Sequence, residues 1–188
     1  MDTPAHRYGH SFDLTSGAYL RPVRLFPSAD STWPLPENVV AFAPTVEPGP
    51  YQWLRLDAAR QAWELVPDYR GVMLWDTGAA TPLPNRLLLG DELPEGVTVL
   101  PPLTIEPGAT LRNAWNAQAQ AWELIPDYSG RPLWHKADGS VAPPLSPGEP
   151  LPDELTDIRP PAHVEAPVRF VEPEGWIQIT RPTGQKAV

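Results

Sequence analysis

In several short stretches of the chain apolar residues are interleaved with polar ones, and turn residues separate these stretches. The clearest series is Tyr51–Leu56, then Gln61–Val66, then Val72–Asp76. A period of two is typical of half-buried strands. We expect these stretches to be three strands of one antiparallel meander.

The second stretch also admits a helix, because three alanines and a tryptophan stand at helical spacing, namely Ala58, Ala59, Ala62 and Trp63. Pro67 would end such a helix before its third turn, and so short a helix is marginal by itself. Asp57 favours a turn as well as a helix start. We prefer the hairpin, with Asp57–Arg60 as its turn.

This pattern is repeated along the chain. QAWELVPDY at Gln61–Tyr69 returns as QAWELIPDY at Gln120–Tyr128, and more than half of positions 45–75 are identical to the residue 59 positions later. Self-similarity at a fixed period is the signature of a repeat architecture. A second motif, here called the Leu-Pro segment, occurs three times at intervals of 58 residues, as Leu35–Val40, Leu93–Thr98 and Leu151–Thr156.

We therefore predict an all-β chain of tandem small three-stranded antiparallel meander modules joined by Pro-rich linkers. The predicted divisions are an N-terminal hairpin segment (1–34), repeat module 1 (35–92), repeat module 2 (93–150) and a shortened C-terminal module (151–188). In the first of these, Ser11–Leu20 predicts a short hairpin after a loosely ordered Met1–His10. The last ends in the strand-like run Val168–Ile179 around Trp176.

Composition explains why the modules should be small. The 27 prolines make up about 14% of the 188 residues, against a usual share of about 5%. Each proline fixes φ and removes an amide donor, so long helices and broad central strands are hard to build. The eight tryptophans compensate, because an indole buries a large area with few torsions to freeze.

Charge and residue usage exclude several classes of partner. A net charge of −9 argues against nucleic acid, which needs basic patches. With no cysteine, disulfides and thiolate metal sites are absent. The first ten residues show no apolar core of a secretory signal, and no apolar run approaches the roughly 20 residues that span a bilayer. We expect no cofactor and no membrane insertion.

The tryptophans fall into two groups. Four recur in register and are interpreted as module core, although exposed indoles would also suit sugar rings: Trp63, Trp75, Trp122 and Trp134. The other four are not in strict register and are better candidates for contact with a partner: Trp33, Trp53, Trp115 and Trp176. With Arg70, which has no copy in the second module, we take Trp33, Trp53 and Trp115 as partner-binding candidates.

Acidic residues invite a catalytic interpretation that we do not favour. A glycosidase needs two carboxylates across a cleft, as Glu64 with Asp68 would offer. Asp68 and its copy Asp127 each follow a proline at a turn, where a carboxylate accepts backbone amides. His6 and His10 are four residues apart, but Pro4 and Gly9 argue against the helix that such a metal pair needs, and we expect no metal site. No nucleophile–base motif is present.

The order of these motifs resembles phage tail-fibre assembly proteins and related tail-fibre segments. The resemblance covers most of residues 11–145. The residues that carry it are Phe12-Asp13, Ser16-Gly17-Ala18-Tyr19, Leu35-Pro36-Glu37, Trp63-Glu64-Leu65, Asp68-Tyr69-Arg70-Gly71 and Trp75-Asp76-Thr77-Gly78, and the second module carries Trp122, Asp127, Gly130 and Trp134. The duplication, the proline content and Ser129 at the position of the second Arg depart from that pattern.

The resemblance implies a non-enzymatic protein that binds a trimeric tail fibre and aids its assembly or forms part of the tail. It would act in the host cytoplasm during assembly, or be retained in the virion tail. A carbohydrate-binding adhesin for host surface glycans is the alternative from another class, and a small hydrolase is a remote third.

Overall fold

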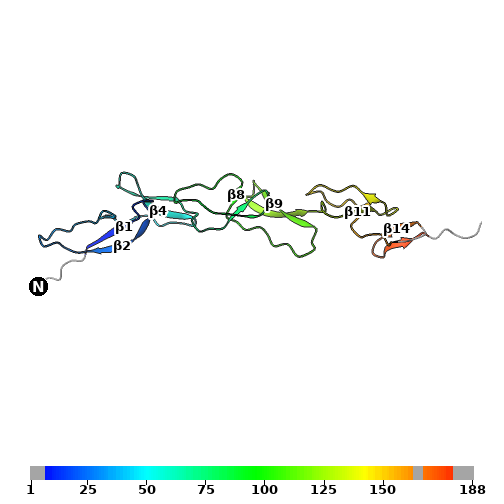
Figure 1. Cartoon of the computed structure of the whole chain (residues 1–188), viewed down its shortest axis with the longest axis horizontal. Helices are drawn as coiled ribbons and strands as arrows, with labels where there is room; N and C mark the ends of the chain where they lie inside the picture. Colours follow the sequence, from blue (N-terminus) through cyan, green and yellow to red (C-terminus); the bar gives the residue numbers. More distant parts are fainter. Residues whose placement is uncertain (1–6, 163–166, 180–188) are drawn as a thin grey trace, which may run out of the picture. The chain divides into compact units, whose positions relative to one another are not determined.

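The computed structural model describes residues 7–162 and 167–179, and all regular secondary structure in them is β-strand (Figure 1). The strands form small antiparallel sheets of two or three strands, so the prediction of an all-β fold of small modules is confirmed. Within these residues no helical segment could span a membrane.

Three of the sheets have three strands and share one arrangement. A middle strand pairs with the strand that follows it and, on its other side, with a Leu-Pro segment. The sheets are β2-β1-β3 (Tyr19–Leu25, Arg7–Phe12, Val39–Val40), β7-β6-β8 (Pro82–Leu83, Leu74–Asp76, Val97–Thr98) and β12-β11-β13 (Val141–Ala142, Leu133–His135, Leu155–Thr156). The three Leu-Pro segments therefore play the same structural role.

Three two-stranded hairpins alternate with these sheets along the chain. They are β4–β5 (Gln52–Leu56 and Trp63–Pro67), β9–β10 (Leu111–Asn116 and Ala121–Pro126) and β14–β15 (Val168–Val171 and Gly175–Gln178). The hairpin prediction for residues 51–66 is confirmed and the helix is wrong. Asp57 explains the outcome, because its carboxylate accepts the amides of Gln61 (2.6 Å) and Ala62 (3.1 Å) and so closes the turn.

The expected third strand of the meander pairs elsewhere. β6 and β11 do not join the preceding hairpin but form the middle of the next three-stranded sheet. Pro67 ends β5, and its carbonyl accepts the Gly90 amide (2.8 Å) instead of continuing a ladder. The predicted division at 92/93 stays a prediction, although the pairing of β8 with β6 crosses it.

The N-terminal segment is more ordered than expected. Of the predicted loose stretch, Arg7–His10 belongs to β1, whereas residues 1–6 lie outside the described part. β2 runs through Pro22, which is tolerated because β2 is an edge strand. The Val39 side chain packs over Gly9, where a Cβ would collide with it, so a glycine lets β1 and β3 pair closely.

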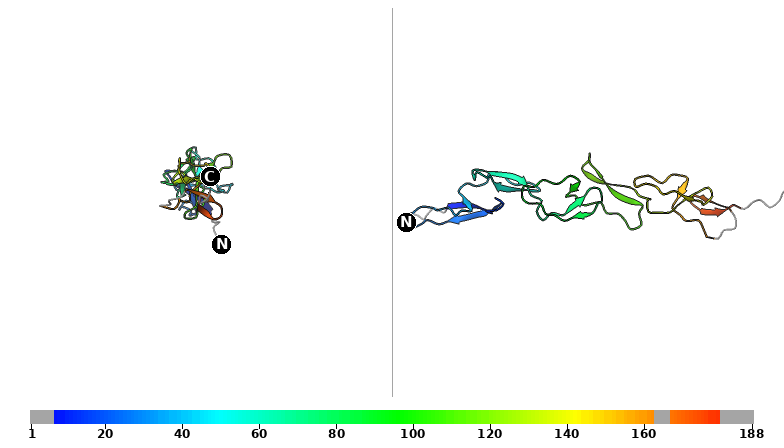
Figure 2. Two further views of the ribbon diagram at one scale, coloured as in Figure 1. Left: turned by 90° about the vertical axis from the view of Figure 1, so that its right-hand side faces the viewer. Right: turned by 45° about the horizontal axis from the view of Figure 1, so that its top comes forward.

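The core is divided into small clusters, and the chain into two units. One unit comprises residues up to 76 with 81–99, the other 77–80 with residues from 100 onward. Figure 2 shows the small sheets from two further directions. The clusters are Phe12, Val40 and Leu56 with Trp63; Ala18, Val66 and Leu89 with Trp53; and Leu133, Ala142 and Leu155 with Tyr128, Leu145 and Leu151.

Candidate functional site

The second strand of each hairpin carries a tryptophan whose indole N–H is bonded to a backbone carbonyl. Trp63, Trp122 and Trp176 donate to the carbonyls of Phe42 (3.1 Å), Leu100 (2.8 Å) and Ile158 (2.8 Å), which stand at equivalent positions after the three Leu-Pro segments. We call these contacts the indole anchors. Each anchor fixes a hairpin to the segment before it.

Trp176 is therefore the structural counterpart of Trp63 and Trp122, although it stands outside the strict sequence register. Trp176 follows its anchor carbonyl by 18 residues, whereas Trp122 follows its own by 22, so the spacing of the first two copies does not find it. The usable signal is the aromatic residue opposite, Phe170, which pairs with Trp176 across the ladder with ring centroids 5.4 Å apart.

The same cross-strand position explains Trp115. It pairs with Trp122 in an edge-to-face contact with centroids 5.3 Å apart, where the first hairpin has Leu56 opposite Trp63. Trp122 is buried, whereas Trp63 is partly exposed and packs on the first core cluster. The prediction that these two repeated tryptophans are core residues agrees with that packing.

The four partner-binding candidates are not gathered into one site. Trp33 lies under the Arg7 guanidinium, 5.1 Å from its ring centroid. The Trp53 indole donates to the Tyr19 carbonyl (2.9 Å) and packs on the second core cluster. No hydrogen bond or ring contact among the described residues joins any two of Trp33, Trp53, Arg70 and Trp115. Their role in binding stays a prediction.

Two tryptophans that were predicted to be core residues are more exposed to solvent than expected. Trp75 and Trp134 are partly exposed in the middle strands β6 and β11. Within the described residues their indole N–H groups have no hydrogen-bond partner, unlike those of the indole anchors. The sequence predicts both residues in the module core, whereas the structure leaves their indoles partly accessible to a partner.

The turns after the first two hairpins hold their carboxylates in structural bonds. Asp68 Oδ1 accepts the Arg70 amide (3.2 Å) and Nε (2.7 Å), and Oδ2 accepts Arg70 Nη2 (2.9 Å). The Arg70 guanidinium lowers the pKa of Asp68. In the second copy, Asp127 accepts the Ser129 amide (3.1 Å) and hydroxyl (2.6 Å), and these bonds lower its pKa. The predicted turn role of both aspartates is confirmed.

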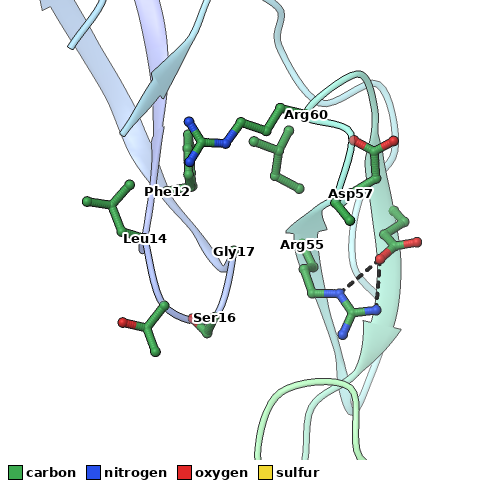
Figure 3. A pocket seen from close by; sticks show the side chains of 11 residues that line it. Phe12, Leu14, Ser16, Gly17, Arg55, Asp57 and Arg60 are labelled. Atoms are coloured by element: carbon green, nitrogen blue, oxygen red, sulfur yellow. Dashed lines mark hydrogen bonds and ion pairs between the residues drawn. The ribbon is translucent and has the colours of Figure 1, made fainter. Parts of the chain in front are cut away.

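A cavity of about 490 Å³ lies where the β1–β2 turn faces the β4–β5 hairpin (Figure 3). Its charged side chains already have partners. Arg55 pairs with Glu64 at 2.8 Å, and the Arg60 guanidinium lies over the Phe12 ring, 5.2 Å from its centroid. Asp57 closes the hairpin turn. Of these three contacts, the one between Arg60 and Phe12 joins the sheet to the hairpin, and the other two stabilise the hairpin itself.

Histidines and acidic residues form no metal-binding group within the described residues. His10 stacks on Tyr19, and its Nδ1 lies 3.3 Å from the tyrosine hydroxyl. His6 and His163 lie outside the described residues.

Exposed apolar residues recur at equivalent positions around the indole anchors. Phe42, Leu100 and Ile158, whose carbonyls accept the indoles, are all exposed. Leu65 and Leu124, in the middle of β5 and β10, are each 37% exposed. The repeat thus carries similar exposed apolar side chains on successive modules.

Comparisons with protein families, with curated proteins and with solved structures found no match to this chain.

Proposed function

We propose that this chain is a non-catalytic binding protein that associates with a phage tail fibre and aids its assembly or forms part of the tail. The observation that carries the proposal is the recurrence of exposed apolar residues at the indole anchors of successive modules. Exposed apolar side chains at equivalent positions offer a partner the same contact on successive modules.

Tandem modules suit a partner that offers the same surface more than once. Linking binding modules makes the second contact intramolecular, so affinity rises without any new kind of contact. A fibre tip built from identical subunits is such a partner. A tail fibre is proposed as the partner because the motifs around Asp13, Leu35 and Trp63 resemble those of tail-fibre assembly proteins.

Co-expression tests this proposal. A fibre protein encoded beside this chain is produced with and without it, then separated by size exclusion and tested for an SDS-resistant trimer. We expect co-elution and a higher yield of trimer when the chain is present. Equal trimer yield without the chain, together with no co-elution, would reject the role in assembly.

A glycan-binding adhesin remains the second candidate because of Trp75 and Trp134. Their partly exposed indoles recur at the same place in two sheets, and aromatic faces bind sugar rings. Binding to a glycan array that is lost in the Trp75→Ala/Trp134→Ala double variant, with folding unchanged, would favour the adhesin. Binding that survives in this variant would count against these residues as the glycan site.

A further inference from the structure

Each of the first two hairpins has one covered strand and one open strand. β4 is covered by the β1–β2 turn, where the Leu56 amide donates to the Gly17 carbonyl at 2.9 Å. β9 is covered by an extended segment, because the Asn113 side chain bonds both the amide (2.8 Å) and the carbonyl (2.9 Å) of Leu103. In the part of the chain that the structure describes, β5 pairs in a sheet only with β4, and β10 only with β9. The outward carbonyls at the ends of the two strands, those of Pro67 and Pro126, accept the amides of Gly90 and Gly148, so the open part of each edge precedes these prolines.

The register shows which backbone groups of β5 face outward. The Asp68 amide donates to the Tyr51 carbonyl at 2.8 Å, so Asp68 faces β4. Because backbone groups alternate in direction along an antiparallel strand, every second residue back from Asp68 also faces β4. Trp63 and Leu65 are the residues between them, and their N–H and C=O groups point away from β4.

β10 repeats this arrangement. The Asp127 amide donates to the Thr110 carbonyl at 2.8 Å, which directs the N–H and C=O groups of Trp122 and Leu124 away from β9. Leu65 and Leu124 have the same exposure, 37%, so an approaching chain meets the same edge twice. A row of unpaired groups on an edge strand is a template for pairing with another chain.

We propose that the open edges of β5 and β10 each accept one extended strand from a basic protein partner built from identical subunits. Strand addition supplies main-chain hydrogen bonds, and side chains at alternate positions supply selectivity. The inference rests on the proposed function as a binding protein and names the surface and chemistry of its partner.

The negative charge of this chain favours a basic partner. Glu64 and Glu123 are exposed on the two open strands, and the chain carries a net charge of −9, so a basic strand is attracted and a second copy of this chain is repelled. The two edges differ in the group that faces the glutamate. Arg55 pairs with Glu64, whereas Ala114 stands opposite Glu123, whose carboxylate accepts the neutral Asn116 side-chain amide at 3.4 Å. The β10 edge therefore binds a basic strand more tightly than the β5 edge.

The test uses the full chain and a nine-residue peptide that alternates lysine and valine, with a glutamate–valine peptide as its charge-reversed control. Calorimetry gives the stoichiometry, and amide hydrogen exchange locates the contact. We expect two peptides per chain, protection of the Trp63, Leu65, Trp122 and Leu124 amides, and at least tenfold weaker binding of the control peptide.

Four variants test the two edges. Leu65→Pro and Leu124→Pro each remove an outward amide that no ladder bond uses, so each should abolish one site and leave the fold intact. Leu65→Thr/Leu124→Thr keeps the amides and should retain both sites. Ala114→Arg copies the Arg55–Glu64 arrangement and should weaken the β10 site to the level of the β5 site. Thermal melting checks that every variant is folded.

The outcomes distinguish this proposal from the proposed function. No binding at millimolar peptide, protection at other amides, equal binding of the control peptide, or unchanged binding by the double proline variant would each overturn strand addition. A fibre that co-elutes equally with the wild-type chain and the double proline variant also overturns it, while leaving the fibre assignment in place. Peptide binding at both edges without fibre co-elution would overturn the fibre assignment alone.

Discussion

The indole anchors combine a large buried ring with one directed hydrogen bond. Trp122 is buried against Trp115, and its N–H is bonded to the Leu100 carbonyl at 2.8 Å. We expect Trp122→Ala to lower the free energy of unfolding by about 3–5 kcal/mol, since both the packing and the bond are lost. Urea denaturation measures this change. The control is Trp75→Ala, which removes a partly exposed ring and should cost clearly less; an equal cost would contradict the anchor role.

The two copies of the post-hairpin turn suggest that Arg70 is replaceable. Ser129 bonds Asp127 where Arg70 bonds Asp68, and both keep the amide-to-carboxylate bond of the turn. We expect Arg70→Ser to change the free energy of unfolding by no more than about 0.5 kcal/mol. Asp68→Ala removes the acceptor and should cost about 1 kcal/mol. A larger loss for the Arg70 variant than for the Asp68 variant would show that the ion pair, not the turn bond, holds this segment.

Asp68 should also make the stability of the fold depend on pH. Its pKa in the folded chain is lowered by the Arg70 side chain. A carboxylate with a lowered folded pKa stabilises the fold above its unfolded pKa, near 3.8, and this contribution is lost as the pH falls through the lower folded value. We expect the melting temperature to fall below about pH 4, and Asp68→Asn to reduce this fall. An identical pH profile for the variant would contradict the assignment.

At the scale of elements, tight turns hold the sheets and hairpins together. Gly17 has φ +73°, and a Cβ there would lie 3.1 Å from the Leu56 carbonyl oxygen, whereas Gly71 has the same φ with nothing nearby. Gly130, the copy of Gly71, does not have positive φ.

Alanine substitutions at these three glycines should cost different amounts of stability, according to the backbone conformation and the contacts of each glycine. Gly71→Ala should cost about 1 kcal/mol from backbone strain alone, and Gly17→Ala should cost more because the β4 backbone must also move. Gly130→Ala should be neutral or stabilising by up to about 1 kcal/mol. The three unfolding free energies, measured under one condition, check this order. Equal costs at Gly17 and Gly71 would mean that the contact with Leu56 is easily displaced.

How far the sequence predicts these elements depends on how local each one is. The β4–β5 hairpin was predictable because Asp57 and the return strand lie within a dozen residues. The pairing of β6 with Val97–Thr98 was not, since a two-residue strand carries no periodic signal and its partner is distant. For the candidate site, the turn role of Asp68 followed from its neighbours. The anchoring of Trp53 and the openness of Trp75 depend on packing between elements, which residue spacing does not reveal.

At the scale of the molecule, strand pairing predicts which fragments fold. Residues 93–150 keep the β9–β10 hairpin but lack β6, the partner of β8, and β13, the second partner of β11. A lone hairpin is marginal in water. We expect this fragment to be largely unfolded by circular dichroism and amide dispersion, whereas residues 100–188 retain native-like signals. A folded 93–150 fragment would show that the modules do not depend on the Leu-Pro segment that follows them.

The pairing of the Leu-Pro segments also determines which changes in chain length keep the sheets intact. Each one completes a sheet that begins in the preceding sequence repeat, as Val97–Thr98 does for β6 and Leu155–Thr156 does for β11. An insertion or deletion that spans a whole period of the repeat therefore preserves every sheet, wherever its ends fall. Recombination between equivalent positions of two copies adds or removes one whole period, so each middle strand still meets a Leu-Pro segment. The number of open strand edges can then vary in whole steps during evolution while the core of each module stays the same.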